Sequence, residues 1–310
     1  ATFITTQAAQ DIILDQNNVF NSSVTMQAGD GSAAFNHITF VDTNGVDLVS
    51  SASSSAGDLY INASTDLAVG GNLSITATTG DITQSGALTI TGTTTLVTIN
   101  AGAEINLAAN GTGNAFTGNL LITTNETGSD IDAHVTIDGG TTDLKIGLST
   151  IEGNLTLLSG GEITDEGIAT VEGTLTATTN QLHKIITLNQ LAVTGALTLA
   201  PNGTGAVTIV NAVNLNLAAS TMGGTFSGTA TTGDISDSGN LAITGAATFI
   251  TTANNRSIIL DQSGNAFTST VTMQAGDGSA TFNNITFVDS AAVRLHSSAA
   301  SAGDLFINAG

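Results

Sequence analysis

The side chains that could support catalysis are few and poorly arranged for it. Cleavage of a glycosidic bond needs two facing carboxyl groups, with Lys or Arg close by to stabilise developing charge. Asp165 and Glu166 are adjacent in the sequence, so on a strand their side chains would point to opposite faces. Lys184 follows His183, but this pair has no counterpart elsewhere in the chain. We therefore predict no catalytic residues, no cofactor-binding residues and no enzymatic activity.

The histidines do not predict a metal site. They are scattered without the short spacing that metal ligands show, at positions His37, His134, His183 and His296. In a second copy of its own segment, His37 is replaced by Asn284, and His296 stands where the first copy has Val49. A required ligand would be retained between copies, so we expect no metal bound by histidine.

Calcium is the one cofactor that the sequence leaves open. Asp30 and Asp277 occur in two copies of a Gly-Asp-Gly-Ser turn, which offers carboxylate and carbonyl oxygens. Calcium needs six to eight oxygens, and neither the EF-hand nor the Gly-Gly-x-Gly-x-Asp repeat is present. Such glycines more often permit a positive φ in a turn. Asp30 and Asp277 are thus weak calcium candidates, and otherwise we expect no metal.

Composition excludes two classes of partner. The 310 residues include 25 acidic and only four basic side chains, giving a net charge of −21. Nucleic acids and anionic membrane surfaces attract clusters of Lys and Arg, which are absent. No apolar run approaches the ~20 residues that span a bilayer, so we expect no membrane insertion. There is no cysteine, and therefore no disulfide framework.

Internal repeats organise the whole chain. Residues 1–63 recur as residues 247–309, including Val-Thr-Met-Gln-Ala-Gly-Asp-Gly-Ser-Ala at 24–33 and 271–280. This defines a super-repeat spanning residues 1–246, with the next copy starting at 247. The chain reads as a single continuous repeat array that begins in mid-repeat, so we expect it to be a fragment of something longer.

A shorter module lies within the super-repeat. The heptapeptide Gly-Asp-Ile-Thr-Gln-Ser-Gly at 80–86 recurs in related form at 161–167 and 233–239. A second motif, Gly-Asn-Ala-Phe-Thr, occurs at 113–117 and 264–268. Small irregularities interrupt the pattern at Asn125 to Thr142 and at Gln181 to Gln190.

The finest pattern predicts short strands stacked in coils. Triplets such as Leu155-Thr156-Leu157 alternate apolar with polar residues, which is typical of a strand with one buried face. Equivalent residues recur about every 22 positions: Ile82 and Ile105, Ile163 and Ile185, Leu175 and Leu197, Ile235 and Ile258. No window shows the helical i, i+3, i+4, i+7 pattern. We predict an all-β fold, a parallel β-helix (β-solenoid) with about 22 residues per coil.

The repeats resemble those of a known class of bacterial exoprotein. Gly71-Asn72-Leu73-Ser74-Ile75-Thr76-Ala77, followed by Gly80-Asp81-Ile82, is similar to the repeats of filamentous-haemagglutinin-type exoproteins. It is also similar to the giant β-strand-repeat surface proteins of bacteria. The resemblance implies a right-handed parallel β-helix, secretion to the cell surface, and an adhesive or fibre-forming role.

Two functional hypotheses remain. The leading one is a structural, non-catalytic segment of an extracellular filament or cell-surface fibre, with self-association head to tail or laterally as its partner interaction. The alternative is a surface adhesin that binds glycans or a cell-surface receptor, for which the irregular segments are the natural sites. Ice binding, which Thr-x-Thr pairs suggest, ranks behind these because strands such as Leu215-Asn216-Leu217 interrupt the pairs, and polysaccharide degradation ranks there too.

Overall fold

The computed structural model describes the residues 1–7, 10, 12–18, 24–28, 37–42, 48–52, 59–61, 67–69, 72–77, 81–84, 86–108, 113–125, 132–277, 283–290, 294–300 and 304–309. Among these, no α-helix occurs, and no helix is long and apolar enough to cross a membrane. Contacts divide the chain into two compact units, Ala1–Gly161 and Glu162–Gly310. Each unit is described by itself.

Alternation of side chains explains why the strands form where they do. In β18 (Leu155–Ser159), Leu155, Leu157 and Ser159 are buried while the two residues between them are partly exposed. β21 (Leu175–Thr179) has the same pattern. Successive side chains of a strand point to opposite faces, so one face of each short strand enters the core and the other meets solvent.

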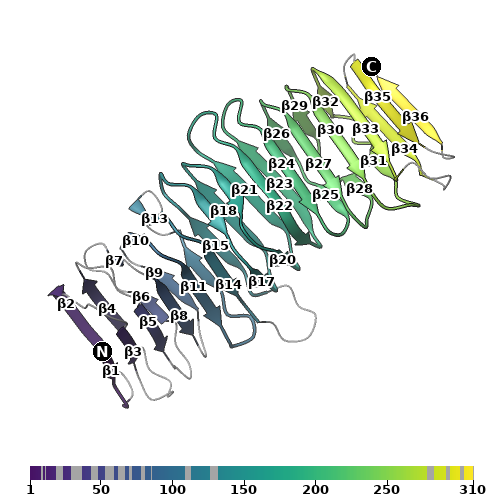
Figure 1. Ribbon diagram of the computed structural model, residues 1–310. Coiled ribbons are helices and arrows are strands. Elements are labelled where there is room, and N and C mark those ends of the chain that lie inside the picture. Colours follow the sequence, from purple (N-terminus) through teal and green to yellow (C-terminus); the bar gives the residue numbers. More distant parts are fainter. Residues whose placement is uncertain are drawn as a thin grey trace. The chain divides into compact units, whose positions relative to one another are not determined.

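The described strands of unit 1 form three parallel sheets (Figure 1). Sheet 1A consists of β1 (Thr2–Ile4), β3 (Val24–Ala28), β5 (Leu48–Ala52), β8 (Leu73–Ala77), β11 (Thr94–Thr98), β14 (Leu120–Thr123), β16 (Leu144–Ile146) and β17 (Ser149–Ile151). Sheet 1B consists of β2 (Ile12–Asn18), β4 (His37–Asp42), β6 (Leu59–Ile61), β9 (Ile82–Gln84), β12 (Ile105–Leu107), β15 (Val135–Asp138) and β18. Sheet 1C is a narrow third face made of β7 (Leu67–Val69), β10 (Leu88–Ile90) and β13 (Ala115–Phe116).

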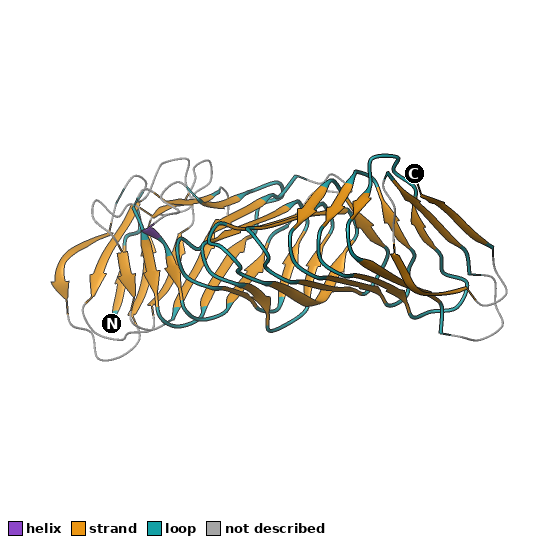
Figure 2. Ribbon diagram, turned by 90° about the horizontal axis from the view of Figure 1, so that it is seen from above, coloured by secondary structure: helices purple, strands orange, loops and turns teal. Residues whose placement is uncertain are grey.

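Unit 2 repeats this plan (Figure 2). Sheet 2A consists of β19 (Ile163–Asp165), β20 (Ala169–Val171), β22 (Ile186–Val193), β24 (Val207–Asn211), β27 (Phe226–Ala230), β30 (Ala247–Thr251), β33 (Thr270–Ala275) and β35 (Arg294–Ala300). Sheet 2B consists of β21, β23 (Ala196–Pro201), β25 (Leu215–Leu217), β28 (Ile235–Asp237), β31 (Ile258–Leu260), β34 (Ile285–Asp289) and β36 (Leu305–Ala309). Sheet 2C consists of β26 (Ser220–Met222), β29 (Leu241–Ile243) and β32 (Ala266–Phe267).

The register of the strands confirms the predicted parallel β-solenoid. Ile82 pairs with Ile105, Leu175 with Leu197, and Ile235 with Ile258, as the sequence spacing predicts. Coil length nevertheless varies around the predicted period. Val207 of β24 pairs with Phe226 of β27 across a short coil, whereas Ile105 of β12 pairs with Val135 of β15 across a much longer one. The extra length lies outside the paired residues, because β12 and β15 stay in register over three positions.

One predicted pair was wrong by a single position. Ile163 pairs with Ile186 rather than Ile185. Ile186 is fully buried, whereas Ile185 is only partly so. In a strand, a shift of one residue moves every side chain to the other face. Two adjacent isoleucines leave that choice open in the sequence, and the core decides it.

In several coils of the described chain, an unbroken strand in one sheet is followed by two short strands, and the sheet that holds the unbroken strand changes along the chain. In unit 1, β8 and β11 are unbroken in sheet 1A, whereas β16 and β17 divide that sheet further along the chain. In unit 2, sheet 2A changes from the short strands β19 and β20 to the unbroken strand β22. After β23, the short strands are β25 of sheet 2B and β26 of sheet 2C. The two irregular segments of the sequence, Asn125 to Thr142 and Gln181 to Gln190, lie at these changes. Residues 126–131 fall outside the described residues.

The core of unit 2 contains a row of phenylalanines. Phe226, Phe249, Phe267 and Phe287 make successive ring contacts, with centroids 5.2, 6.0 and 5.2 Å apart. These side chains are at most 2% exposed. They come from all three sheets, so the row joins the faces of the solenoid across the core. Sequence spacing alone does not predict the row, because its members occupy different positions in their coils.

Candidate functional site

Asp165 and Glu166 do not form a catalytic pair. Asp165 is buried, whereas Glu166 is exposed on the other face of the chain. The two carboxylate oxygens of Asp165 accept hydrogen bonds from the backbone N–H groups of Asn189, at 3.0 Å, and Gln190, at 2.6 Å. Asp165 thus holds the next coil in place, and both of its oxygens are engaged.

The described histidines bond to the backbone of the following coil. Nδ1 of His134 accepts the N–H of Asn154 at 3.1 Å, and Nδ1 of His183 accepts the N–H of Thr204 at 3.2 Å. His183 has a φ of 65°, a left-handed conformation that is uncommon for a residue other than glycine. The fold does not bring these two side chains together. The side chains of His37 and His296 lie outside the described part of the chain.

The calcium candidates are only partly described. Asp30 lies outside the described residues. Asp277 is exposed and follows Gly276, which has a φ of 79°, so the glycine serves the turn in the way the sequence suggests. Among the described residues, no group of three or more His, Cys, Asp or Glu side chains is placed to hold a metal ion.

A buried polar residue occupies one position in all three copies of the heptapeptide module. These residues are Gln84, Asp165 and Asp237, at most 9% exposed. Each lies two positions after a buried isoleucine and faces inward like it. In the sequence, Asp165 stands out only as a catalytic candidate, and the recurrence of a buried polar residue at this position is not predicted. The available signal was a polar residue recurring where the alternating pattern calls for an apolar one.

In two of the three modules this residue bonds to the asparagine of the Gly-Asn-Ala-Phe-Thr motif. Gln84 and Asn114 exchange amide hydrogen bonds of 2.9 and 3.2 Å. Asn114 also donates to the carbonyls of Leu107 and Asp138, and its oxygen accepts the N–H of Leu88. We call this arrangement a clasp, because it joins two repeated motifs across successive coils.

The second clasp replaces the glutamine with a carboxylate. Nδ2 of Asn265 donates to Oδ2 of Asp237 at 2.6 Å, while Oδ1 of Asp237 accepts the N–H of Asp261 at 3.0 Å. The oxygen of Asn265 accepts the N–H of Leu241, as Asn114 does for Leu88. Next along the same edge, the carboxylate of Asp289 accepts the N–H of Phe267 at 3.2 Å.

Burial changes the acidity of the two inward carboxyl groups. Loss of hydration raises the pKa of Asp165 and of Asp237 above the ordinary value of 3.8, because a low-dielectric environment disfavours the charged form. The N–H donors oppose this shift only in part, and the charges of Glu166 and Asp261 add to it. Protonation of these two groups is therefore coupled to folding.

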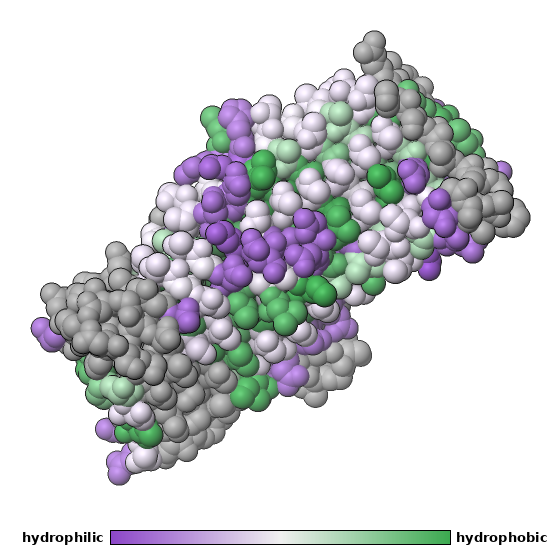
Figure 3. Space-filling view, viewed as in Figure 1, coloured by the Kyte–Doolittle hydropathy of each residue, from purple (hydrophilic) through white to green (hydrophobic). Residues whose placement is uncertain are grey.

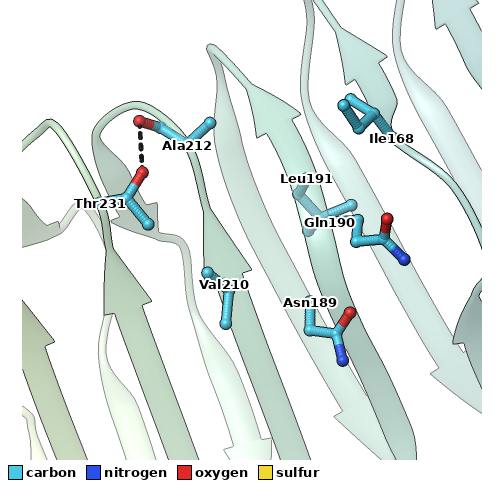
Figure 4. A pocket seen from close by; sticks show the side chains of 7 residues that line it. All are labelled: Ile168, Asn189, Gln190, Leu191, Val210, Ala212 and Thr231. Carbon is cyan, nitrogen blue, oxygen red and sulfur yellow. Dashed lines mark hydrogen bonds between the residues drawn. The ribbon is translucent and has the colours of Figure 1, made fainter.

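A surface hollow lies where β22 and β24 meet on unit 2 (Figure 4). Its volume is about 300 Å³, and it is lined by Ile168, Asn189, Gln190, Leu191, Val210, Ala212 and Thr231. Figure 4 shows Ile168 on one side, Val210 and Ala212 on the other, and residues 189–191 between them. No charged residue lines the hollow.

The change from two short strands to one unbroken strand in sheet 2A explains why the hollow exists. Residues 166–168 form an outward corner between the short strands β19 and β20, whereas β24 runs unbroken through the corresponding place. β22 bridges the two shapes, and its register to β24 shifts between Leu188 and Leu191. Asp165 binds the two N–H groups at this shift. The hollow thus lies where the outward corner at residues 166–168 is not repeated in the next coils. The buried carboxylate of Asp165 fixes the backbone of β22 at this place.

An outward row of hydroxyl groups crosses sheet 2A. Its members pair on successive strands: Thr164, Thr187, Thr208, Ser227, Thr248 and Thr272. The interruptions seen in the sequence fall on sheet 2B instead. The second outward row of sheet 2A is mixed, with Val210, Thr229, Ile250 and Gln274, so the two parallel threonine rows of an ice-binding face are not present on β24, β27, β30 and β33.

The stacked parallel strands, with motifs repeated from coil to coil, define a β-solenoid repeat protein. A family model described as "Repeats of unknown function (DUF5649)" matches residues 36–123, 132–200 and 204–274. The chain belongs to that family. No curated protein matches, and no solved structure matches.

Proposed function

We propose that this chain is a structural, non-catalytic segment of an extracellular filament or cell-surface fibre. The observation that carries the proposal is the reuse of the clasp. The same polar contact recurs at Gln84–Asn114 and Asp237–Asn265, so what the repeats retain from copy to copy is the means of stacking coils. In a scaffold of this kind each coil contacts only its neighbours, so further coils can be added without changing the cross-section. The resemblance to bacterial fibre-forming exoproteins supports secretion and a cell-surface location.

Self-association is the partner interaction that fits this role. The edge of a parallel sheet offers backbone groups that another strand can pair with. We propose that copies join head to tail through such edges, without a cofactor.

Electron microscopy of the purified chain tests the proposal. Filaments of uniform width that lengthen with protein concentration are expected. Replacing Leu305 and Ile307 by lysine should shorten them, because charge on an edge strand opposes strand pairing, while leaving circular dichroism unchanged. Discrete short particles at every concentration would contradict a filament.

The adhesin alternative has one observation in its favour. The irregular segment ending at Gln190 leads into the surface hollow, where the carboxamides of Asn189 and Gln190 are exposed. A glycan array would decide: clear binding that is lost on replacing Asn189 and Gln190 by alanine would favour an adhesin over a purely structural segment.

A further inference from the structure

Strand β22 contains a β-bulge where it pairs with β24. The register shifts by one residue between Leu188 and Leu191, so Asn189 and Gln190 together lie opposite a single residue, Val210. Both bulge residues are exposed, whereas the two leucines are buried. A bulge interrupts the ladder of backbone hydrogen bonds and leaves its extra residue unpaired. The N–H groups of the bulge therefore need acceptors other than a neighbouring strand.

The preceding coil turns away from the sheet beside the bulge. β22 pairs with β19 up to Thr187 and with β20 from Leu191 onwards, and between these two short strands the chain forms the outward corner. The carboxylate of Asp165 takes the place of the missing strand. Its oxygens lie 3.0 Å from the backbone nitrogen of Asn189 and 2.6 Å from that of Gln190. On this side, one side chain holds both N–H groups of the bulge.

The ionisation state of Asp165 decides whether both bonds can form. An ionised carboxyl group is only an acceptor, and each of its oxygens can accept one of the two N–H groups. A protonated carboxyl group carries an O–H donor on one oxygen, and this donor would face an N–H group. Hydrogen bonds to a charged acceptor are also stronger than those to a neutral one. Uptake of a proton by Asp165 therefore removes at least one bond of the bulge and weakens the other.

The surroundings of Asp165 move this proton uptake to a higher pH. Loss of hydration raises the pKa of Asp165 above 3.8, the N–H bonds oppose the rise in part, and the charge of Glu166 adds to it. The strands β20, β21, β22, β23 and β24 contain no charged side chain. The charged or titratable side chains on the adjoining turns are those of Glu162, Glu166, Glu172, His183 and Lys184.

We propose that the bulge at Asn189 and Gln190 is a pH-sensitive switch, closed while the carboxyl group of Asp165 is ionised and open once that group is protonated. In the closed state both N–H groups bond to Asp165, and in the open state at least one bonds to water. Water can reach the bulge because both of its side chains are exposed. Figure 3 shows hydrophilic side chains at the surface among hydrophobic ones on the face that it displays.

The change should stay local. On either side of the bulge, residues 186–188 and 191–193 are paired with the neighbouring strands, and these ladders do not depend on Asp165. Asn189 and Gln190 line the hollow, so the shape of the hollow depends on pH. The switch does not rest on the proposed fibre, and the experiments below measure it in the single chain.

A pH titration of the full chain by nuclear magnetic resonance tests the switch. The backbone amide signals of Asn189 and Gln190 should shift as the pH is lowered from 7 towards 3. Their midpoint should equal that of the carboxyl carbon of Asp165 and lie above 3.8. Amide signals of β21 and β23 should stay in place over the same range, as should circular dichroism. Glu166→Gln removes a like charge and should lower the midpoint without abolishing the titration.

Asp165→Asn should hold the switch open at every pH. Asparagine places an NH2 donor where one carboxylate oxygen stood. The amides of Asn189 and Gln190 should therefore exchange with solvent about ten- to a hundredfold faster than in the wild-type chain at pH 7, and their signals should no longer titrate. Asp237→Asn is the matched control, because Asp237 is also a buried carboxyl group with a raised pKa, and the titration of the bulge should persist in it.

Three results would overturn the proposal. The first is that the bulge amides of the wild-type chain do not titrate with Asp165. The second is that they keep their wild-type protection in a folded Asp165→Asn variant. The third is that they change only at the pH at which the signals of β21 and β23 change as well, which would indicate acid unfolding of the chain. The titration of the wild-type chain decides the matter even if the variant does not fold.

Discussion

Gln84 and Asn114 lie on different coils of the chain, and their side-chain amides bond to each other in the core of unit 1. Both are at most 3% exposed. The pair joins β9 to the turn before β13, and so fixes the corner at which sheet 1B gives way to sheet 1C. Asp237 and Asn265 do the same in unit 2. A buried polar contact of this kind favours one register over its neighbours, since any other register leaves its donors without acceptors.

Removing the asparagine of a clasp should destabilise the coils around it. Asn114→Ala removes the acceptor of the Leu88 N–H, a donor to two carbonyls and both amide bonds with Gln84, which keeps only its bond to the carbonyl of Gly86. Unsatisfied buried groups cost about 1–3 kcal/mol each, although loss of several partners of one residue is not additive. We expect a loss of about 3 kcal/mol in the free energy of opening, measured by hydrogen exchange in β9 and β10. Asn189→Ala, at an exposed position, is the control and should change little.

The two buried carboxyl groups should make the chain more stable in mild acid. Their pKa is raised in the folded state, so the native state binds the proton more tightly than the unfolded state does. The stabilisation is complete below pH 3.8, the ordinary pKa, and is lost as the pH rises through the folded values.

The double variant Asp165→Asn, Asp237→Asn tests this dependence. The wild-type melting temperature minus that of the variant should increase as the pH is lowered from 7 towards 4. The comparison of the two proteins removes the general effect of the −21 charge. A difference that stays constant across this range would show that neither carboxyl group titrates differently in the two states.

Gly228 should not tolerate a side chain. A Cβ there would lie 2.7 Å from Cζ of Phe226 and 3.0 Å from Cδ2 of Leu215. Overpacking of a core typically costs about 1–3 kcal/mol, so Gly228→Ala should lower the free energy of unfolding by about that amount. Adding Phe226→Leu makes room and should recover part of the loss. If the double variant loses at least as much free energy of unfolding as the two single variants lose together, the clash with the Phe226 ring is not the cause.

Phe249 should cost more to remove than Phe226 or Phe287, which lie at the ends of the row in unit 2 and have a ring contact on one side only. It contacts both Phe226 and Phe267 and is fully buried. Phe→Ala changes in cores cost about 3–5 kcal/mol, and we expect this range for Phe249→Ala by urea denaturation. Phe306→Ala, at an exposed position on β36, provides the comparison and should have little effect on unfolding.

The sequence by itself determined the class of fold and most of the register. The alternation in strands such as β18 and β21 states which face is buried, and the regular recurrence of apolar positions places Leu175 beside Leu197. Both signals are local or strictly periodic, and burial of apolar residues enforces them directly. The same repeats located the heptapeptide and Gly-Asn-Ala-Phe-Thr motifs, although not the contact between them.

Only the tertiary structure decided what the turns and polar residues do. The coil that joins Ile105 to Val135 is much longer than the one that joins Val207 to Phe226. A fixed period therefore cannot show that Gln84 meets Asn114. It also cannot choose between Ile185 and Ile186, because both suit a buried strand. Turns differ in length, so the spacing in the sequence does not show which side chain enters the core after each turn. Only the stacking of one coil on the next decides this.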